Sequence, residues 1–352
     1  MSAVADRLRL RIAEIGPIPF ASFMEEALYG DGGYYSSGGS PVGRDFVTGS
    51  SLSPLFGRTT AALLARLGSQ LGGEVDYLEA GFGGGQHLAA VAGAWSEDRG
   101  RFLAWDRAGG AVPRGVERIG APATVGEGSL RGLVFSYELL DALSVHRLIG
   151  RADGSLGELW VESDGAELRY VEGDLSDARL VDLLGGVPLE AGQIADLSPE
   201  WVPLYESLAS RIDRGLIVTC DYGFARQGLL DPRVRRNGTL ACYRSHQVHR
   251  NPFEDVGSQD LTAHVDFTAL RVAGEAQGFE TIAFSRQALW LAGAGLFELI
   301  RGASATERGE AMALLDGEGM GEEIRVLVQG KGVDASAVFD LQIVGAAACG
   351  VP

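Results

Sequence analysis

The fold is decided by the stretch Tyr77-Leu78-Glu79-Ala80-Gly81-Phe82-Gly83-Gly84-Gly85, an apolar strand that ends in an acid and a glycine turn. A run of helical character follows the turn, from residue 86 to residue 95. Because glycine lacks a Cβ and permits positive φ, Gly81, Gly83 and Gly85 let the backbone approach a flat ligand closely. The stretch therefore predicts a nucleotide-like cofactor. The structural alternative is a tight turn that only packs the strand on the helix.

The spacing of the glycines separates one cofactor from another. A dinucleotide fingerprint reads G-x-G-x-x-G, whereas the order here is G-x-G-x-G, which disfavours a nicotinamide dehydrogenase. An acid just before the first glycine repels a pyrophosphate, but it accepts a hydrogen bond from the ammonium group of a cofactor that carries an amino acid. Glu79 is such an acid, and S-adenosylmethionine is such a cofactor.

A second acid, Asp106, follows the next predicted strand, residues 101–105. Its carboxylate would accept hydrogen bonds from both ribose hydroxyls, as the equivalent acid does in dinucleotide sites. Taken alone, Asp106 is as well explained as a solvated strand end. The predicted cofactor is S-adenosylmethionine, and the predicted cofactor-binding set is Glu79, Gly81, Gly83, Gly85 and Asp106.

Charge and cysteine content limit the partners of the chain. Its 352 residues include 47 acidic and 30 basic side chains, for a net charge of −17. A nucleic-acid backbone needs clustered Lys and Arg, so no nucleic-acid partner is expected, whereas a cationic substrate is favoured. The alternative is that the charge only keeps the protein soluble. Cys220, Cys242 and Cys349 match no metal-ligand spacing, so no metal is expected.

The N-terminal residues 1–15 predict an amphipathic surface helix. Arg7, Arg9 and Arg11 interrupt them, which argues against a secretory signal or a membrane span. No other segment has the apolar length that a bilayer crossing needs, so no membrane partner is expected. We expect a cytoplasmic protein whose cysteines are reduced.

Strand and helix signals alternate after the glycine turn, which predicts a doubly wound α/β core. The strands at 133–135 and 215–221 are nearly all apolar, as in a parallel sheet covered on both faces. Helical apolar spacing is found at 20–28, 53–71, 201–212 and 266–277. Strands are predicted at 279–285, and at 323–328 with 339–344 as the closing antiparallel edge.

Two segments between core strands are much longer than one crossover requires. The first contains the pattern of a hairpin, at 156–161 and 167–171, and the second, 222–264, predicts an ordered active-site loop. The predicted organisation follows in chain order: an N-terminal helical extension and loop over the active site (1–60), the first part of the core (61–143), an inserted substrate region (144–213), a core strand (214–222), an active-site loop insertion (223–264) and the end of the core (265–352).

Glu138 and Asp141 follow the strand at 133–135 with a spacing of three, which would place both carboxylates on one side of a first helical turn. Such a pair would orient a guanidinium or an amine and accept its proton. The alternative is that the acids stabilise a helix N-terminus through its dipole. His146, His246 and His264 are candidate bases for an oxygen nucleophile, and for each the alternative is a structural hydrogen bonder, which is the commoner role of a lone histidine.

Several further motifs resemble those of the MidA-like class I methyltransferases, a family that includes a mitochondrial complex I assembly factor that methylates an arginine. The resemblance covers roughly residues 15 to 285. Besides the glycine turn, its motifs are Pro19-Phe20, Phe23-Met24, Leu28-Tyr29, Gly33-Tyr34-Tyr35, Gly43-Arg44-Asp45-Phe46-Val47-Thr48, Phe56-Gly57, Glu138-Leu139-Leu140-Asp141-Ala142-Leu143, Val145-His146, Asp221-Tyr222-Gly223, Gly238-Thr239-Leu240, Tyr243, His246 and the run from Gln259 to Phe267. It implies a Rossmann-like, seven-stranded core that binds S-adenosylmethionine at the strand ends.

The chain departs from the family pattern at the expected mouth of the pocket. The family has proline in place of Phe82, asparagine in place of Tyr137 and proline in place of Ser144. It also has a Pro-Glu pair in place of Ser50-Ser51, and often glycine in place of Arg44. The missing carboxylate at Ser51 weakens the case for a guanidinium substrate, because bidentate pairing with arginine needs a negative partner.

The sequence thus predicts an S-adenosylmethionine-dependent methyltransferase that acts on a nucleophilic nitrogen or oxygen. The acceptor is either a protein arginine or a small molecule, which leaves a natural-product O- or N-methyltransferase open. A catalytically silent cofactor-binding or assembly protein is the other alternative, because bulky rings at Phe82 and Tyr137 would block a pocket. A homodimer also stays open. The predicted catalytic set is Glu138, Asp141, Tyr137 and His146.

Overall fold

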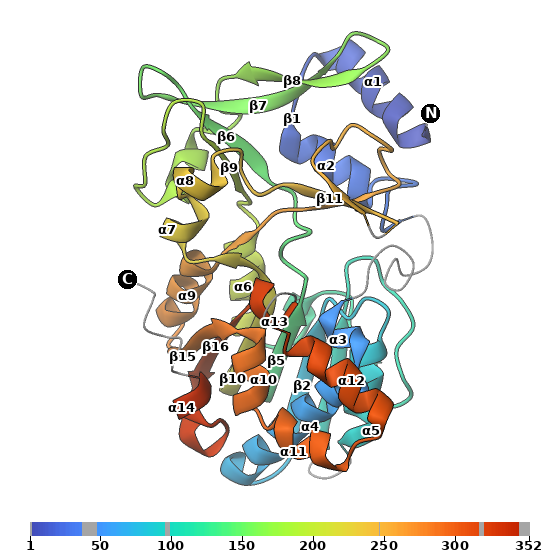
Figure 1. Ribbon diagram of the computed structural model, residues 1–352, viewed down its shortest axis with the longest axis vertical. Coiled ribbons are helices and arrows are strands. Elements are labelled where there is room, and N and C mark those ends of the chain that lie inside the picture. The colour runs from blue at the N-terminus through green and yellow to red at the C-terminus, as the bar shows by residue number, and fades with distance from the viewer. Residues whose placement is uncertain (1, 37–47, 96–98, 246, 317–319, 345–352) are drawn as a thin grey trace. The chain divides into compact units, whose positions relative to one another are not determined.

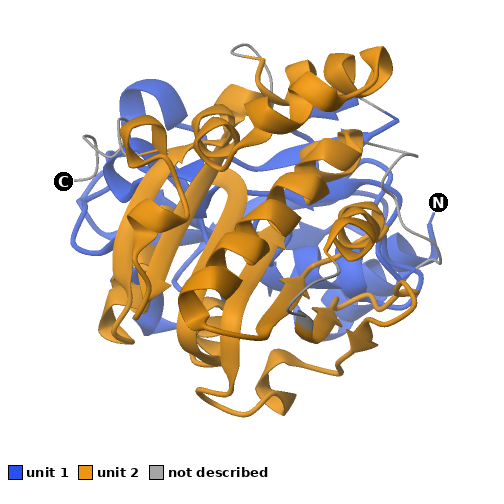
Figure 2. Ribbon diagram, turned by 90° about the horizontal axis from the view of Figure 1, so that it is seen from below, with its two compact units in different colours: residues 1–46, 140–201, 223–266 blue, residues 47–139, 202–222, 267–352 orange. Residues whose placement is uncertain are grey.

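The computed structural model describes residues 2–36, 48–95, 99–245, 247–316 and 320–344. The chain divides into two compact units, shown in different colours in Figure 2. Unit 1 consists of residues 1–46, 140–201 and 223–266, and unit 2 of residues 47–139, 202–222 and 267–352. Each unit is therefore assembled from three separate segments of the chain.

Unit 2 is built on a twisted sheet with the strand order β15-β16-β10-β5-β2-β3-β4. The strands β10, β5, β2, β3 and β4 are mutually parallel, and β16 runs antiparallel to both β10 and β15. Their bounds are β2 Val75–Ala80, β3 Arg99–Trp105, β4 Glu117–Arg118, β5 Leu130–Tyr137, β10 Ile212–Phe224, β15 Glu280–Arg286 and β16 Ile324–Lys331. The predicted doubly wound α/β core is confirmed, including the two apolar central strands.

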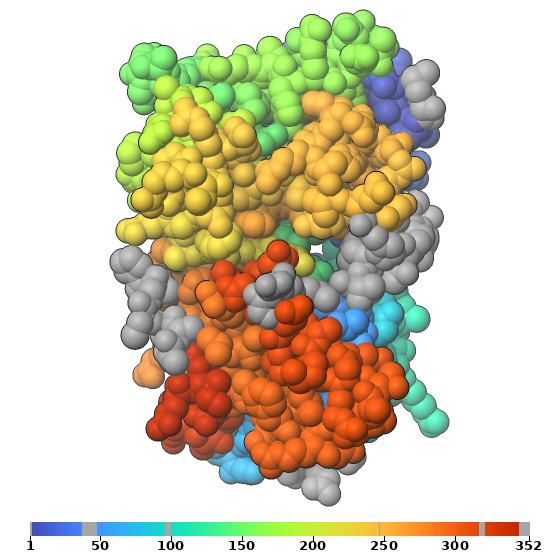
Figure 3. Space-filling view, viewed as in Figure 1, coloured from blue at the N-terminus to red at the C-terminus, as the bar shows by residue number. Residues whose placement is uncertain are grey.

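Helices of unit 2 cover this sheet (Figure 1). Their bounds are α3 Gly49–Leu52, α4 Pro54–Leu71, α5 Gln86–Ala94, α6 Trp201–Ala209, α9 Phe267–Ala276, α10 Gln287–Gly293, α11 Leu296–Gly302, α12 Ala305–Leu314, α13 Met320–Glu323 and α14 Leu341–Val344. In the space-filling view, α10, α11 and α12 hide the strands behind them (Figure 3). The longest, α4, begins where the Ser53 hydroxyl accepts the Leu55 N–H at 3.3 Å, and it ends at Gly72, whose left-handed conformation caps it.

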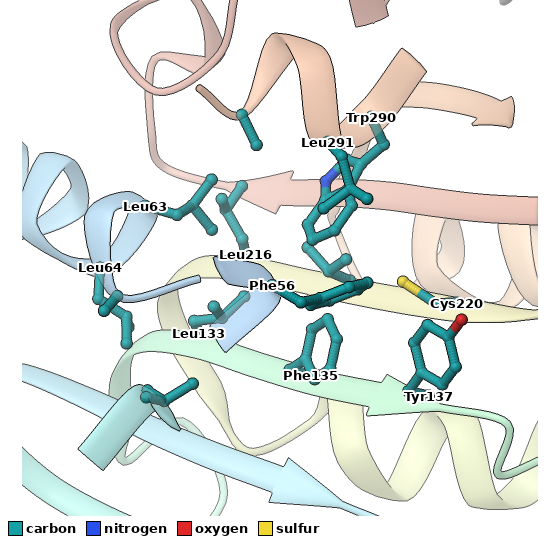
Figure 4. Close-up of a cluster of buried hydrophobic side chains, with 14 of the residues drawn as sticks. Phe56, Leu63, Leu64, Leu133, Phe135, Tyr137, Leu216, Cys220, Trp290 and Leu291 are labelled. Atoms are coloured by element: carbon teal, nitrogen blue, oxygen red, sulfur yellow. The ribbon is translucent and has the colours of Figure 1, made fainter. Parts of the chain in front are cut away.

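The core of unit 2 is an aromatic and aliphatic cluster between helices and sheet (Figure 4). Phe56 of α4 lies with its ring centroid 5.5 Å from that of Tyr137 on β5 and 5.6 Å from that of Trp290 on α10. Phe135 on β5 meets the same Trp290 at 6.3 Å. Burying each of these rings stabilises the fold by roughly 2–3 kcal/mol, so α4 and α10 are held on one face of the sheet.

Unit 1 contains a five-stranded antiparallel sheet of order β1-β7-β6-β9, with β8 paired to β7. The bounds are β1 Ile18–Pro19, β6 His146–Gly150, β7 Leu156–Ser163, β8 Leu168–Gly173 and β9 Ile194–Leu197. The predicted hairpin is therefore confirmed as β7 and β8. Two helices precede it, α1 Ala3–Ile15 and α2 Phe20–Tyr29.

The second long segment between core strands, residues 222–264, also has regular structure. It forms the short helices α7 Arg226–Leu229 and α8 Pro232–Arg235, and the three-stranded sheet β12 Gln247–His249, β11 Ala241–Arg244 and β13 Asp260–Thr262. A further strand, β14 Val265–Asp266, pairs in parallel with the last two residues of β10. Within the described ranges, no helix has the length and apolar content that a bilayer span requires.

Two predicted elements are wrong. Residues 339–344 do not form an edge strand, because the Asp340 carboxylate accepts the Gln342 N–H at 3.0 Å and starts the short helix α14. The closing antiparallel edge is made by β15 and β16 instead. Residues 138–143 form no helix after β5 but a series of bends and one turn, so Glu138 and Asp141 do not share a helical turn.

Candidate functional site

The topology of unit 2 indicates where a ligand binds. After β2 the chain continues to β3 and β4 on one side, and it then returns to β5 on the other side of β2. Ligands of open α/β sheets bind outside the carboxyl ends of the strands at such a reversal of strand order. The glycine turn follows the carboxyl end of β2, and Glu138 follows that of β5, so both flank this point.

The glycine turn has the backbone conformation that its sequence predicts. Gly81, Gly83 and Gly85 have φ values of 75°, 51° and 75°, in the region that favours glycine. A Cβ at Gly81 would lie 2.9 Å from Cδ1 of Leu139, so the turn after β2 is pressed against the segment after β5. Gly85 is the N-cap of α5 and offers no side-chain acceptor to the first N–H groups of that helix.

Asp106 joins the end of β3 to the glycine turn. One carboxylate oxygen accepts the Gly83 N–H at 2.9 Å, and the other accepts the Ala108 N–H at 2.8 Å. Burial raises the pKa of Asp106 above its usual value, although both backbone donors lower it. Each oxygen keeps a lone pair for a ligand hydroxyl, which is the role that the sequence predicts for this acid.

Glu79 is the penultimate residue of β2 and is only 4% exposed. Its Oε2 accepts hydrogen bonds from the Tyr77 hydroxyl at 2.8 Å and from Nδ1 of His87 at 2.9 Å. Sequence reasoning missed His87, the second residue of α5. The signal was available, because an acid at the end of a strand and a histidine in the first turn of the next helix come together across a glycine turn.

Glu138 has an unusual backbone conformation for a residue with a side chain, with φ of 47°. Neighbouring groups hold it in place: its N–H donates to the Cys220 carbonyl at 2.9 Å, and the Leu139 N–H donates to the Asp221 carboxylate at 3.2 Å. Asp221 is fully buried at the end of the parallel part of β10. The carboxyl ends of β5 and β10 are thus tied together around Glu138.

Tyr137 and Phe82, the two rings that depart from the family pattern, belong to the buried core of unit 2. The Tyr137 hydroxyl donates to the Gln287 side chain at 2.6 Å, and burial raises its pKa well above the usual range. The Phe82 ring packs on Gly110, where a Cβ would come within 3.0 Å of it. Both rings point into the packed interior, where each fills space.

Asp141 and His146 belong to unit 1. The Asp141 side chain is buried, and its carbonyl accepts the Ala263 N–H at 3.0 Å. Nδ1 of His146 lies 2.7 Å from Oε1 of the fully buried Glu158, which also accepts the Ser176 N–H. Desolvation raises the pKa of Glu158, but these hydrogen bonds outweigh it and hold the pKa below its usual value. Nδ1 of His146 therefore donates to Glu158, which fixes the orientation of the ring.

The other candidates contribute less. The backbone N–H of His264 donates to the Thr239 hydroxyl at 3.1 Å, and its ring lies 5.5 Å from the ring of Phe224, as for a histidine that fixes a loop. The Ser51 hydroxyl accepts from Thr48 at 3.0 Å at the start of α3. His246, Arg44 and Asp45 lie outside the described residues. The catalytic roles of all these side chains stay predictions.

The residues of unit 2 fit S-adenosylmethionine. Three glycines with positive φ form a turn without side chains, one acid lies beneath it and a second acid lies beside it. Among the described residues, no donor reaches Oε1 of Glu79, so this oxygen is available to an ammonium group. Asp106 would hold the ribose, and the turn would lie against the methionine portion.

Solved structures share this fold over nearly the whole chain. A crystal structure from Burkholderia thailandensis bound to S-adenosyl-homocysteine matches with a TM-score of 0.85 and 28% identity, covering 94% of this chain and 92% of that one. A native crystal structure of an uncharacterized protein from the same organism and superfamily matches with a TM-score of 0.83 and 28% identity, covering 96% and 94%.

The parallel sheet with antiparallel β16, the glycine turn at the reversal of strand order and the two acids define a class I methyltransferase. The model of a family described as "Putative S-adenosyl-L-methionine-dependent methyltransferase" matches residues 121–285. Over these residues the chain is similar to this family of S-adenosylmethionine-dependent methyltransferases, in agreement with the resemblance to the MidA-like family that its sequence motifs indicate.

A curated relative is similar over most of the chain. It is the "Protein arginine methyltransferase NDUFAF7 homolog, mitochondrial" of Drosophila melanogaster, 27% identical over 320 residues, which cover 78% of this chain and 71% of the relative. The relative is mitochondrial by name, so the cytoplasmic location expected from the sequence stays a prediction.

Proposed function

We propose that this methyltransferase acts on a guanidinium nitrogen of an arginine side chain in a protein. Glu79, the glycine turn and Asp106 would hold the cofactor, and Glu138 would orient the acceptor. The proposal is supported by the arginine methyltransferase to which the chain is similar, and by a net charge of −17 that favours a cationic acceptor.

The observation that carries the proposal is the conformation of Glu138. A side chain at φ of 47° costs on the order of 1–2 kcal/mol relative to an ordinary conformation. Such residues persist where the surroundings enforce them, and they concentrate at functional sites. Here the enforced residue is a carboxylate at the reversal of strand order, next to the turn that would bind the cofactor.

Methyl transfer to a guanidinium requires alignment of the acceptor with the methyl group, a fixed orientation of the guanidinium and removal of a proton. S-adenosylmethionine supplies an electrophilic methyl group on a sulfonium, and the acceptor nitrogen must approach it in line. A carboxylate at Glu138 would accept N–H bonds from the guanidinium, which fixes its plane and directs a nitrogen lone pair. The same carboxylate would then take the proton that the methylated nitrogen releases.

Product analysis tests the acceptor class. The full-length protein is incubated with methyl-labelled S-adenosylmethionine and a cell lysate, and protein is separated from small molecules by acid precipitation. We expect label in precipitated protein, recovered as methylated arginine after acid hydrolysis. Label in the acid-soluble fraction would instead identify a small-molecule methyltransferase, and alkali-labile label in protein would identify an oxygen acceptor; either result overturns the arginine proposal.

Two variants separate the acceptor role from the cofactor role. Glu138→Gln should abolish labelling while S-adenosylhomocysteine binding, measured by calorimetry, stays unchanged. Glu117→Gln removes an exposed carboxylate from β4 of the same sheet and is the matched control that should label normally. Binding of S-adenosylhomocysteine without any labelled product in the unmodified protein would favour the catalytically silent alternative.

A further inference from the structure

A buried chain of polar side chains runs beneath the glycine turn. It begins at Thr60 on α4, whose hydroxyl lies 3.1 Å from Nε2 of His87 on α5, and it continues through Nδ1 of His87 to Glu79. The Tyr77 hydroxyl completes it from the other side of the same carboxylate. All four residues are at most 4% exposed, so the chain is shielded from water along its whole length.

Packing fixes the positions of both groups that donate to Glu79. The His87 ring stacks on Phe135 with a centroid distance of 4.7 Å and meets the edge of Phe56 at 5.3 Å. The Tyr77 ring meets Phe102 edge-on at 5.1 Å. Neither ring can turn without disturbing the core, so the two donors are preorganised.

The hydrogen bond to Glu79 also fixes which His87 nitrogen donates to it. A carboxylate only accepts, so Nδ1 carries the hydrogen that is shared with Glu79. The Tyr77 hydroxyl donates as well, and burial next to Glu79 raises its pKa well above the usual range. The Tyr77 hydroxyl therefore stays a donor at neutral pH.

Both donors converge on one oxygen of the carboxylate, Oε2. Burying a carboxylate is expensive, and an apolar residue at this position of β2 would fill the core at lower cost. Two fixed donors offset part of that cost and leave the other oxygen, Oε1, in one orientation. This is the arrangement expected of a ligand-binding group whose supporting hydrogen bonds set its geometry.

We propose that His87 and Tyr77 are positioning residues for the amino-acid half of the cofactor. By holding Oε2 of Glu79, they direct Oε1 to the ammonium group of S-adenosylmethionine. The inference rests on the cofactor site of the proposed function, and it does not depend on the methyl acceptor. It predicts that the two residues act on the ammonium group and not on the adenosine.

Two ligands that differ in the amino-acid half test this assignment. S-adenosylhomocysteine carries the ammonium group, whereas 5′-methylthioadenosine has the same nucleoside and lacks it. Calorimetry on the full-length protein should show that Tyr77→Phe and His87→Leu each weaken S-adenosylhomocysteine about tenfold, the effect of losing a hydrogen bond to a charged group. The affinity for methylthioadenosine should change less than about twofold.

Further variants guard against trivial explanations. His87→Asn keeps an N–H close to the position of Nδ1 and should retain most of the affinity for S-adenosylhomocysteine. Tyr205→Phe removes another buried tyrosine hydroxyl, which bonds to Gln329, and should change neither affinity. In a Glu79→Gln background, Tyr77→Phe should no longer change the ratio of the two affinities, because both act through one group.

The outcomes separate this inference from the proposed function. Equal losses for both ligands would mean that the two residues only support the fold, and no loss for either would mean that Glu79 needs no support; each overturns the inference while the cofactor site stands. An unmodified protein that binds neither ligand would overturn the cofactor site itself and the inference with it.

Discussion

The conformation of Glu138 lowers the stability of the protein, while its side chain has a proposed role in catalysis. Its left-handed backbone disfavours a side chain, while the proposed orientation of the acceptor requires one. Glu138→Asn should raise the free energy of unfolding by about 1 kcal/mol, because asparagine tolerates this conformation better. The same change should slow methyl transfer about a hundredfold by removing the carboxylate.

Urea unfolding and initial rates measure the two effects. Glu138→Gln is the control, because it removes the charge without suiting the conformation, so it should lose activity without gaining stability. An asparagine variant that is less stable than the unmodified protein would show that the backbone of Glu138 is not strained.

The pH dependence of cofactor binding should report on Asp106. Only the ionised carboxylate accepts hydrogen bonds from both ribose hydroxyls, and burial raises its pKa above the ordinary value. The affinity for S-adenosylhomocysteine should therefore rise with pH through that raised pKa and become constant above it. Calorimetry across the acidic range should show this rise in affinity. Asp106→Asn should abolish the pH dependence and weaken binding.

The stability of the cofactor-free protein should change in the opposite direction. A carboxyl group whose pKa is raised by folding contributes stability that is complete below its unfolded pKa and is lost as the pH rises through its folded pKa. As the pH rises through the same acidic range, the affinity for S-adenosylhomocysteine should therefore increase while the stability of the cofactor-free protein decreases. If the affinity of Asp106→Asn still rises with pH over this range, the pH dependence belongs to another titrating group.

At the scale of elements, the sequence predicts long regular patterns well and short ones poorly. The apolar runs of β5 and β10, the β7–β8 hairpin and α4 are all where their periodicity predicts, because a buried strand or a long amphipathic helix carries many consistent residues. In contrast, α14 has four residues, too few for its period to be told from that of a strand.

The residues of the candidate site also differ in how well the sequence predicts them. The glycine turn was predictable, because its conformation is local and only glycine adopts it easily. The conformation of Glu138 was not, since contacts with Cys220 and Asp221 of a distant strand impose it. His87 was not predicted either, although its place in the first turn of α5, across the glycine turn from Glu79, offered a local signal.

In unit 1, a buried ion pair joins β6 and β9 to a following loop. Arg147 donates to one Asp196 oxygen at 2.8 Å, while the other oxygen accepts the N–H groups of Thr239 and Leu240 at 2.6 and 2.8 Å. Desolvation lowers the pKa of Arg147, but Asp196 outweighs it and raises that pKa. A single carboxylate thus neutralises a buried guanidinium and satisfies two backbone donors.

Asp196→Ala should therefore destabilise the protein by about 3–5 kcal/mol, because it leaves Arg147 buried without its counter-ion. Thermal or urea unfolding measures the change. Arg151→Met removes the ion pairs of a half-buried arginine, at the edge of the same sheet, with Glu172 and Asp174, and it should change stability little. A similar small effect of both variants would show that the buried pair is not a main support of this sheet.

At the scale of the whole molecule, the net charge of −17 bears on the choice of acceptor. If the charge attracts a cationic protein segment, added salt should screen it, because the screening length falls from about 30 Å at 0.01 M to about 10 Å at 0.1 M salt. The KM for an arginine-rich peptide should then rise about tenfold between these concentrations, with kcat unchanged.

The affinity for S-adenosylhomocysteine serves as the internal reference for this measurement. This ligand has no net charge at neutral pH, so its dissociation constant should change less than about twofold over the same range of salt. A peptide KM that is equally insensitive to salt would contradict electrostatic recruitment. The charge would then serve solubility alone, and the case for a cationic acceptor would rest on Glu138 and on the similarity to an arginine methyltransferase.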